Sequence, residues 1–155
     1  MNKTHDQLKG EIRYAIRLCQ RTARFYRRIQ TVGVFLAIIG GSATMATLFN
    51  SLPQWIAVTG SIMLSLSGAA LIAIRPADKA AQNEFDIRRY QTLMTKAILL
   101  NTDELELAIE EAHQGDAPEL ESLRNIAYND VMQEFNRMDC AIALNPWQKI
   151  LSLLA

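Results

Sequence analysis

Charge is missing from a long stretch in the middle of the chain. No Asp, Glu, Lys, Arg or His occurs between Arg28 and Arg75, which leaves 46 consecutive uncharged positions, residues 29–74. A helix on the surface of a soluble domain carries charged or polar residues on its outer face. The stretch therefore predicts helices that lie in a lipid bilayer. It disfavours the alternative, a helical hairpin buried in a soluble bundle.

Residues that bind metals or activate substrates are also scarce. The two cysteines, Cys19 and Cys140, stand far apart without C-x-x-C spacing, so neither a zinc site nor a disulfide framework is expected. Glu110 and His113 form one E-x-x-H pair, whereas a di-metal site in a helical bundle needs two such pairs and further carboxylates. There is no Gly-rich phosphate loop and no nucleophile elbow. We therefore predict no catalytic residue, no metal site, no cofactor and no enzymatic activity.

The uncharged stretch divides into two segments, each of the length of a membrane span. Residues 31–49, TVGVFLAIIGGSATMATLF, and residues 54–74, QWIAVTGSIMLSLSGAALIAI, contain 19 and 21 uncharged residues. A helix of about 20 apolar residues crosses the ~30 Å hydrocarbon core of a bilayer. Between the segments lies NSLP, residues 50–53, whose Asn, Ser and Pro favour a turn. Trp55 lies where an aromatic residue of the membrane interface is expected. The pattern predicts a transmembrane helical hairpin.

The charges on either side of this hairpin predict its orientation. Residues 1–28 contain eight Lys or Arg and two acids, a net charge of +6, and residues 75–155 contain eight and fourteen, a net charge of −6. Basic residues next to a span mark its cytoplasmic side, and here they are Arg21, Arg24, Arg27 and Arg28 before the first span and Arg75 and Lys79 after the second. We therefore expect both termini in the cytoplasm. A signal peptide is disfavoured, because the apolar segment is too long and lacks a small-residue cleavage site.

Small residues form rows at helical spacing in both spans. Gly33, Ala37 and Gly41 repeat every four positions in the first span, and the row in the second span consists of Ser61, Ser65, Ala69 and Ala73. Such rows let helix backbones approach closely in lipid. Two interpretations stay open. Either both rows close the hairpin within one chain, or one row closes it and the other packs against a second copy in a homo-oligomer.

Arginines line one face of a helix predicted over residues 7–30. They are Arg13, Arg17, Arg21, Arg24 and Arg28, and a second face carries Ile12, Ile16, Cys19, Ala23 and Tyr26. Aromatic residues for base stacking are scarce, so no nucleic-acid partner is expected. The basic stripe suits anionic lipid headgroups. It also suits the acidic tail of the same chain, in which five acids lie within residues 103–111.

Helices are predicted for the remainder of the chain, and no strand pattern occurs. Arg75-Pro76 ends the second span and opens a helix over residues 77–100. Asn101 and Glu104 resemble a capping box for a helix to His113, and a longer helix is expected from Asp116 and Pro118 to about Asp139.

A last helix follows Asn145-Pro146. Its apolar stripe, Trp147, Ile150, Leu151 and Leu154, suits packing in a core better than the alternative, a place in the lipid headgroup layer.

The predicted fold is thus all-α, in three parts. Residues 1–30 form a cytoplasmic basic amphipathic helix, residues 31–74 form the transmembrane hairpin, and residues 75–155 form a cytoplasmic acidic helical module.

Two quoted segments flank the hairpin in a distinctive order. RTARFYRRIQ precedes the first span, and DKAAQNEFDIRRYQTLMTKAI, with Tyr90 and Leu93, follows the second. Over about residues 10–100 this arrangement resembles the SLATT family of bacterial two-transmembrane proteins. The resemblance implies an effector of the bacterial inner membrane that oligomerises and permeabilises the bilayer when a linked cytosolic sensor or signalling partner detects phage, a form of abortive infection. The family has no catalytic residues to carry over.

Two other functions remain as alternatives. One is a scaffold that forms no pore, anchored in the lipid bilayer and recruiting a cytosolic partner through its helical tail. The other is a phage holin, which the 81 residues after the second span disfavour.

Overall fold

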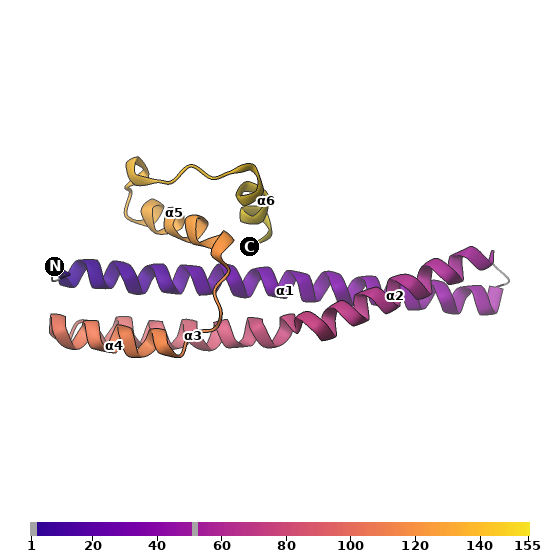
Figure 1. The fold of residues 1–155 in the computed structure, drawn as a ribbon, viewed down its shortest axis with the longest axis horizontal. Helices are drawn as coiled ribbons and strands as arrows, with labels where there is room; N and C mark the ends of the chain where they lie inside the picture. The colour runs from indigo at the N-terminus through magenta and orange to yellow at the C-terminus, as the bar shows by residue number, and fades with distance from the viewer. Residues whose placement is uncertain (1–2, 51–52) are drawn as a thin grey trace. The chain divides into compact units, whose positions relative to one another are not determined.

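The computed structural model describes residues 3–50 and 53–155, and every regular element in them is a helix (Figure 1). The order is α1 His5–Asn50, α2 Gln54–Ile74, α3 Pro76–Lys96, α4 Thr102–Gln114, the 3-10 helix η1 Glu121–Leu123, α5 Arg124–Glu134, the 3-10 helix η2 Met138–Cys140, and α6 Pro146–Leu154. The all-α class is confirmed for these residues. The turn predicted over residues 50–53 falls partly outside them, because 51 and 52 are not described.

The chain folds into two compact units. One consists of the residues up to Phe25 together with Lys79–Ala155, and the other is Tyr26–Asp78. Helix α1 runs from His5 to Asn50 without a break, so the helix predicted over residues 7–30 and the first uncharged segment belong to one element.

Three helices share the first core of the unit that contains both termini. Leu8, Ile12 and Ala15 recur every three to four residues on α1, so they lie on one face of the helix. They are buried against residues of α3, α4 and the turn after α3, namely Tyr90, Leu93, Ala97, Leu105, Ile109 and Ala112. Complete burial of an aliphatic side chain such as Ile12 contributes roughly 1.5–3 kcal/mol. This core joins the start of α1 to α3 and α4.

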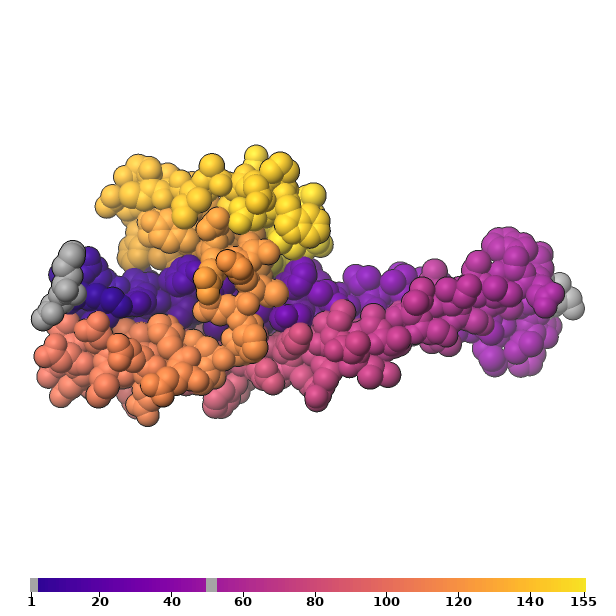
Figure 2. Space-filling model, viewed as in Figure 1, coloured from indigo at the N-terminus to yellow at the C-terminus, as the bar shows by residue number. Residues whose placement is uncertain are grey.

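The C-terminal elements pack on another face of the same helix. Leu18 of α1 is buried together with Leu123, Ile126, Ala127, Leu151 and Ala155, and Phe25 packs against this cluster. Figure 2 shows the C-terminal residues, in yellow, covering one side of the N-terminal part of α1. Two separate faces of α1 are therefore occupied within this unit.

Local capping chemistry explains several helix boundaries. Arg75 adopts a left-handed conformation with φ 50°, and its N–H donates to the carbonyl of Leu71, which ends α2 before Pro76 opens α3. At α4, the N–H of Glu104 donates to the side chain of Asn101 at 2.9 Å, and the N–H of Asn101 donates to Glu104 at 3.1 Å. The predicted capping box is confirmed. Asn145 and Gln148 form a second one at α6.

The helix predicted from Asp116 to Asp139 is wrong at both ends. Asp116 caps no helix, because its carboxylate accepts hydrogen bonds from Tyr90 and Arg89. The helical residues begin only at Glu121 and end at Glu134, two residues before Asn136, which has φ 54°. The helix predicted over residues 77–100 likewise ends early, at Lys96, where the N–H of Leu99 bonds back to the Lys96 carbonyl in a turn.

The prediction that the apolar stripe of the last helix packs in a core is also wrong for three of its four residues. Leu151 is buried at 6% exposure, whereas Trp147, Ile150 and Leu154 are 61%, 51% and 44% exposed. The reason is that α6 packs on the unit along one edge of its apolar arc only.

In the other unit, α1 and α2 touch through their backbones. A Cβ atom placed on Gly40 would lie 2.5 Å from the carbonyl oxygen of Gly60, and one on Gly60 would lie 2.6 Å from that of Gly40. One turn further along α1, the hydroxyls of Thr44 and Ser61 are 3.3 Å apart. Towards the other end of the contact, Gly33 faces Leu71. Glycine at position 40 is therefore required by the approach of the two helices.

Replacing Gly40 with Leu should separate these helices, because the Gly60 backbone cannot move aside as a side chain would. The measurement is a disulfide between T44C and S61C in a chain with C19S and C140S, detected as protection of both thiols from a maleimide that adds mass. The parent chain should form the disulfide and G40L should lose it. G41A is the matched control, since the nearest atom to its added Cβ is 4.0 Å away. Equal cross-linking in G40L would contradict the contact.

The two native thiols should differ sharply in reactivity. Burial, with the nearby carboxylates of Asp116 and Asp86, raises the pKa of the Cys19 thiol to about 12, whereas Cys140 is exposed. The thiolate is the reactive form, so a maleimide at neutral pH should modify one thiol per native chain in detergent. C140S should abolish the labelling and C19S should leave it intact, with a second thiol appearing in denaturant. Equal labelling of both cysteines in the native chain would show that the core around α1 is wrong.

Candidate functional site

Among the residues that the structure describes, two helices are long and apolar enough to cross a membrane. Only 6% of the residues in the most apolar window of α1 are buried, and 11% in the corresponding window that begins in α2. The core helix of a soluble protein would instead be mostly covered. Large apolar side chains that are widely exposed include Phe35, Ile38, Leu48, Leu66 and Ile72. Their surface is what a lipid environment accommodates.

The predicted small-residue rows have different surroundings. Gly33, Ala37 and Gly41 are partly buried, and Gly33 and Gly41 face α2 through Leu71 and Leu64. The members of the second row, Ser61, Ser65, Ala69 and Ala73, are all exposed. The structure of the single chain therefore does not bring the two rows together.

The closest approach uses Gly40, which lies outside the predicted rows, and Gly60 beside the second row. Adjacent residues of a helix point about 100° apart, so a Gly-Gly pair at 40 and 41 leaves the contact face undecided. The glycines at positions 40 and 60 were visible in the sequence, but the sequence alone did not show that they form the contact between the helices.

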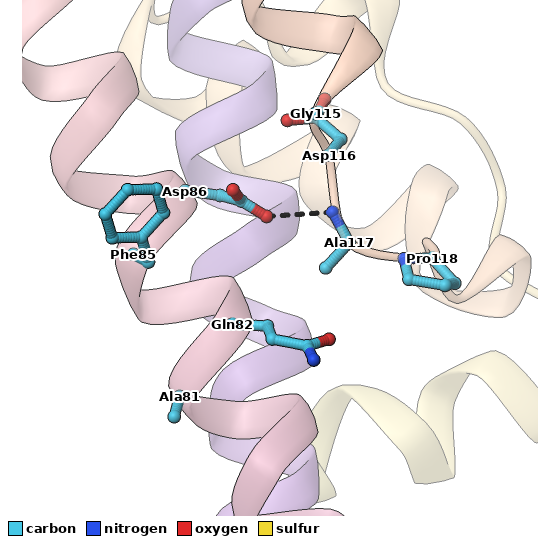
Figure 3. Close-up of a pocket in the computed structure, with 8 residues that line it drawn as sticks. All are labelled: Ala81, Gln82, Phe85, Asp86, Gly115, Asp116, Ala117 and Pro118. Atoms are coloured by element: carbon cyan, nitrogen blue, oxygen red, sulfur yellow. Dashed lines mark hydrogen bonds between the residues drawn. The ribbon is translucent and has the colours of Figure 1, made fainter.

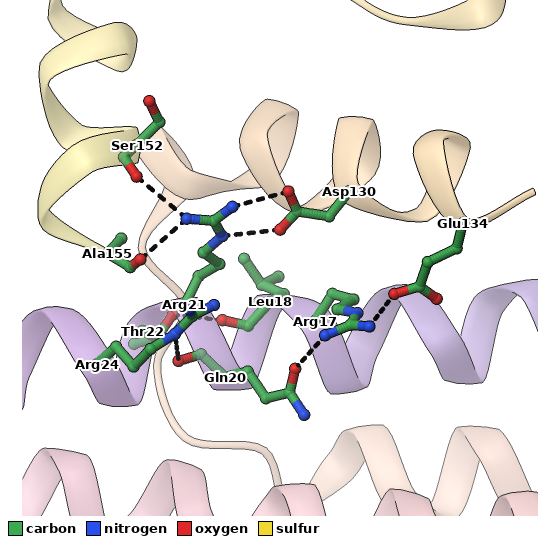
Figure 4. Close-up of polar contacts among 10 residues, drawn as sticks. All are labelled: Arg17, Leu18, Gln20, Arg21, Thr22, Arg24, Asp130, Glu134, Ser152 and Ala155. Atoms are coloured by element: carbon green, nitrogen blue, oxygen red, sulfur yellow. Dashed lines mark hydrogen bonds and ion pairs between the residues drawn. The ribbon is translucent and has the colours of Figure 1, made fainter. Parts of the chain in front are cut away.

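Arg21 is the centre of a polar cluster on α1 (Figure 4). Its Nε and Nη2 donate to the two carboxylate oxygens of Asp130 at 2.7 and 2.8 Å, and its Nη1 donates to the carbonyls of Ser152 and Ala155 at 3.1 and 2.9 Å. The Arg21 and Asp130 side chains are 18% and 22% exposed, so the pair is partly shielded from water. Paired hydrogen bonds of this fork geometry are strong and directional.

Two more arginines of the stripe contact the same side of the unit. Arg17 forms an ion pair with Glu134 and donates to Gln20 at 2.9 Å, while the guanidinium of Arg13 lies 4.9 Å from the centroid of the Phe135 ring. A cation over an aromatic face is attracted by the ring's charge distribution. Glu134 is the last residue of α5, and Phe135 follows it directly. We call this set of contacts, Arg13, Arg17 and Arg21 with Asp130, Glu134, Phe135 and the carbonyls of 152 and 155, the arginine dock.

The residues predicted to orient the hairpin fall into two groups. Arg24, Arg27, Arg28, Arg75 and Lys79 are exposed, and Arg75 forms an ion pair with Asp78 at 2.6 Å. Arg21 differs, since it is half-buried in the arginine dock. Sequence reasoning did not identify Asp130 and Glu134, because nothing local distinguishes them from the other acids of the tail.

A second polar cluster links α3 to the segment after α4 (Figure 3). Asp86, which is 2% exposed, accepts from the Ala117 N–H at 2.9 Å and pairs with Arg89 at 3.0 Å, and Arg89 also pairs with Asp116. Burial raises the pKa of the Asp116 carboxyl, although the Tyr90 hydroxyl and the Arg89 charge oppose the shift. These bonds hold the chain after α4 against α3.

An open pocket of about 490 Å³ lies beside this cluster, lined by Ala81, Gln82, Phe85, Asp86 and Gly115–Pro118. Its two carboxylates already accept hydrogen bonds from Arg89, Tyr90 and Ala117. Within residues 3–50 and 53–155, no group of three or more His, Cys, Asp or Glu side chains comes together in a way that could hold a metal ion.

Comparison of the chain with protein-family models, with curated proteins and with solved structures finds no match. The similarity to the SLATT family therefore rests on the quoted segments and stays a prediction.

Removing the Arg21 side chain should weaken the arginine dock measurably. R21A deletes charge-assisted hydrogen bonds to Asp130 and leaves that carboxylate partly buried without its partner, so we expect a loss of about 2 kcal/mol in the free energy of unfolding. R88A is the matched control, because Arg88 is an exposed arginine of α3 outside the dock, and it should cost less than about 1 kcal/mol. The measurement is denaturant unfolding in detergent. The double variant R21A/D130N should cost little more than R21A alone, and full additivity would contradict the pairing.

Proposed function

We propose that the chain is an oligomeric protein of the bacterial inner membrane that permeabilises the bilayer on a cytoplasmic cue, in anti-phage defence. The observation that carries the proposal is the outward exposure of the apolar side chains of α1 and α2 over a stretch without charge. Leaving apolar surface in water costs about 25 cal/mol per Å². A bilayer removes that cost along both helices.

In this proposal, α1 and α2 cross the membrane as a hairpin that the Gly40–Gly60 contact holds together. The exposed basic residues Arg24, Arg27 and Arg28 precede the hairpin, and Arg75 and Lys79 follow it. Because basic flanks remain on the cytoplasmic side, both termini lie in the cytoplasm. The polar unit with the arginine dock is then cytoplasmic too.

Permeabilisation requires several copies, since two helices cannot enclose an aqueous path. Ser61 lies beside Thr44 in the contact between α1 and α2, whereas Ser65, Ala69 and Ala73 of the same row are exposed. This exposed part of the row supports a contact between copies, because small residues allow close helix packing in lipid. The face of α1 with Gly33 and Gly41 is already used within the chain. This favours the interpretation in which one row closes the hairpin and the other joins neighbours.

The arginine dock supplies an element on which a cue could act. While α5 and α6 hold Arg17 and Arg21, these charges are unavailable to lipid headgroups or to a partner. A cytosolic sensor or signalling partner that competes for the dock would free them. The scaffold remains the second candidate, since the same dock could serve recruitment alone.

Ser65→Leu should abolish permeabilisation, because the larger side chain blocks close approach at the exposed face of α2 without touching the contact between α1 and α2. S42L is the matched control, since Ser42 is also exposed but lies on α1 outside both rows. Both changes are made in an R21A chain, in which the dock is weakened, and induced cells are assayed for membrane potential and dye exclusion at equal protein levels. R21A and R21A/S42L should depolarise the cells, and R21A/S65L should not.

Two outcomes would contradict parts of the proposal. Intact membrane potential in cells that express R21A, with and without phage infection, would exclude the effector and favour the scaffold. Depolarisation by R21A/S65L equal to that of R21A would remove the exposed row from the contact between copies.

A further inference from the structure

We propose that α6 binds the interfacial layer of a lipid bilayer through the side chains of Trp147, Ile150, Leu153 and Leu154, here called the outer face of α6. The inference rests on the membrane location in the proposed function and goes beyond it, since it assigns a lipid contact to an element far from the spans in sequence.

The outer face of α6 is apolar and uncovered. Its four side chains are 61%, 51%, 78% and 44% exposed, while Leu151 and Ala155 of the same segment are 6% and 3% exposed. At 100° per residue, Leu153, Ile150, Leu154 and Trp147 follow one another around the helix and end next to Leu151. The apolar arc of α6 is thus much wider than the edge that packs on the protein.

The remaining arc of α6 is polar. Gln148, Lys149 and Ser152 occupy it, and Gln148 completes the capping box that fixes the start of the helix. A short helix with a broad apolar face, a terminal Trp and a Lys on its polar side is typical of segments that lie in the plane of the membrane interface.

Chain length keeps α6 near the predicted membrane surface. Phe25 of α1 packs against the cluster that contains Leu151, and it lines an apolar hollow of about 160 Å³ together with Trp147. Position 31, where the first span is predicted to begin, comes six positions after Phe25. Even fully extended, this stretch of chain reaches at most about 21 Å, and as a helix about 9 Å. This limit holds for any placement of the two units.

A lipid surface fits the outer face better than a second protein does. Four side chains on a helix of nine residues fall well short of the roughly 800 Å² per partner that a stable protein interface buries. Insertion into the headgroup boundary needs only a strip of apolar side chains about 5–10 Å deep. The apolar hollow beside Trp147 adds to the surface that lipid would cover.

The two tryptophans of the chain allow a direct test in the full-length protein. Reconstituted into phosphatidylcholine–phosphatidylglycerol vesicles, W55F reports on Trp147 alone and W147F reports on Trp55 alone. Fluorescence quenching is measured with lipids brominated at shallow or deep acyl positions and, separately, with acrylamide in the aqueous phase. We expect blue-shifted Trp147 emission that shallow bromines quench more than deep ones, with little quenching by acrylamide.

A charge on the outer face should reverse this pattern. In the W55F chain, L153E should shift Trp147 emission to the red and lose the quenching by brominated lipid. L107E is the matched control, because Leu107 is an exposed leucine of α4 outside the outer face, and it should leave Trp147 unchanged. Native thiol labelling, one modified cysteine per chain, verifies that both variants are folded.

Each other outcome overturns a specific part. If Trp55 is quenched by lipid but Trp147 by acrylamide only, the chain is in the membrane and the inference about α6 is wrong. Quenching of neither tryptophan by lipid would overturn the membrane location itself. In a third outcome, Trp147 is shielded from both quenchers and becomes accessible to acrylamide as the protein is diluted in lipid. This result would show that a second copy of the chain, and not lipid, covers the outer face of α6.

Discussion

Helix α1 has to be stable in two surroundings along its length, and the other elements follow from this constraint. Up to Phe25, two of its faces pack against other helices of its unit and a stripe of arginines is left to be satisfied. From position 29 to its end at Asn50, the helix contains no charged side chain that water could solvate. The first part therefore needs protein partners for its arginines. The second part needs a neighbouring helix and, at the proposed membrane location, lipid. Contacts with α5 and α6 satisfy the arginines of the first part. Helix α2, through its glycine contact, is the neighbouring helix of the second part.

In each of these two contacts, one residue sets the geometry. Arg21 donates four hydrogen bonds, two to the Asp130 carboxylate and two to backbone carbonyls, which fixes the direction of approach of α5 and α6 as apolar packing alone would not. Gly40 acts through the absence of a side chain, since only hydrogen at that position allows the Gly60 carbonyl to come so close. The Arg21 contact depends on the paired hydrogen bonds of a planar guanidinium, so it does not tolerate a side chain of another shape. The Gly40 contact depends on exposed backbone, so it does not tolerate a larger side chain.

The sequence predicts most of what local chemistry decides. The capping box at Asn101 and the breaks at Arg75-Pro76 and Asn145-Pro146 need only residues within a few positions, and the all-α class follows from periodicity. The helix expected at Asp116 failed because Tyr90 and Arg89, more than twenty residues away, claim the carboxylate. The choice of Gly40 over Gly41, and of Asp130 and Glu134 among fourteen acids of the tail, depends on how elements pack. Pairwise geometry of this kind leaves no mark in a single sequence.

The side chains of α6 point in different directions for two roles, packing on the protein and the proposed contact with lipid. Leu151 and Ala155 face the protein, and the carbonyls of Ser152 and Ala155 face Arg21. The apolar side chains of the outer face point elsewhere. A lipid surface that covers them would leave both the apolar cluster and the arginine dock in place, so it would hold α6 rather than release it. In the proposed function, a cue that frees the stripe therefore has to act on the polar side, at Asp130 and Glu134. There, partial exposure to water leaves the ion pairs within reach of a competing charge.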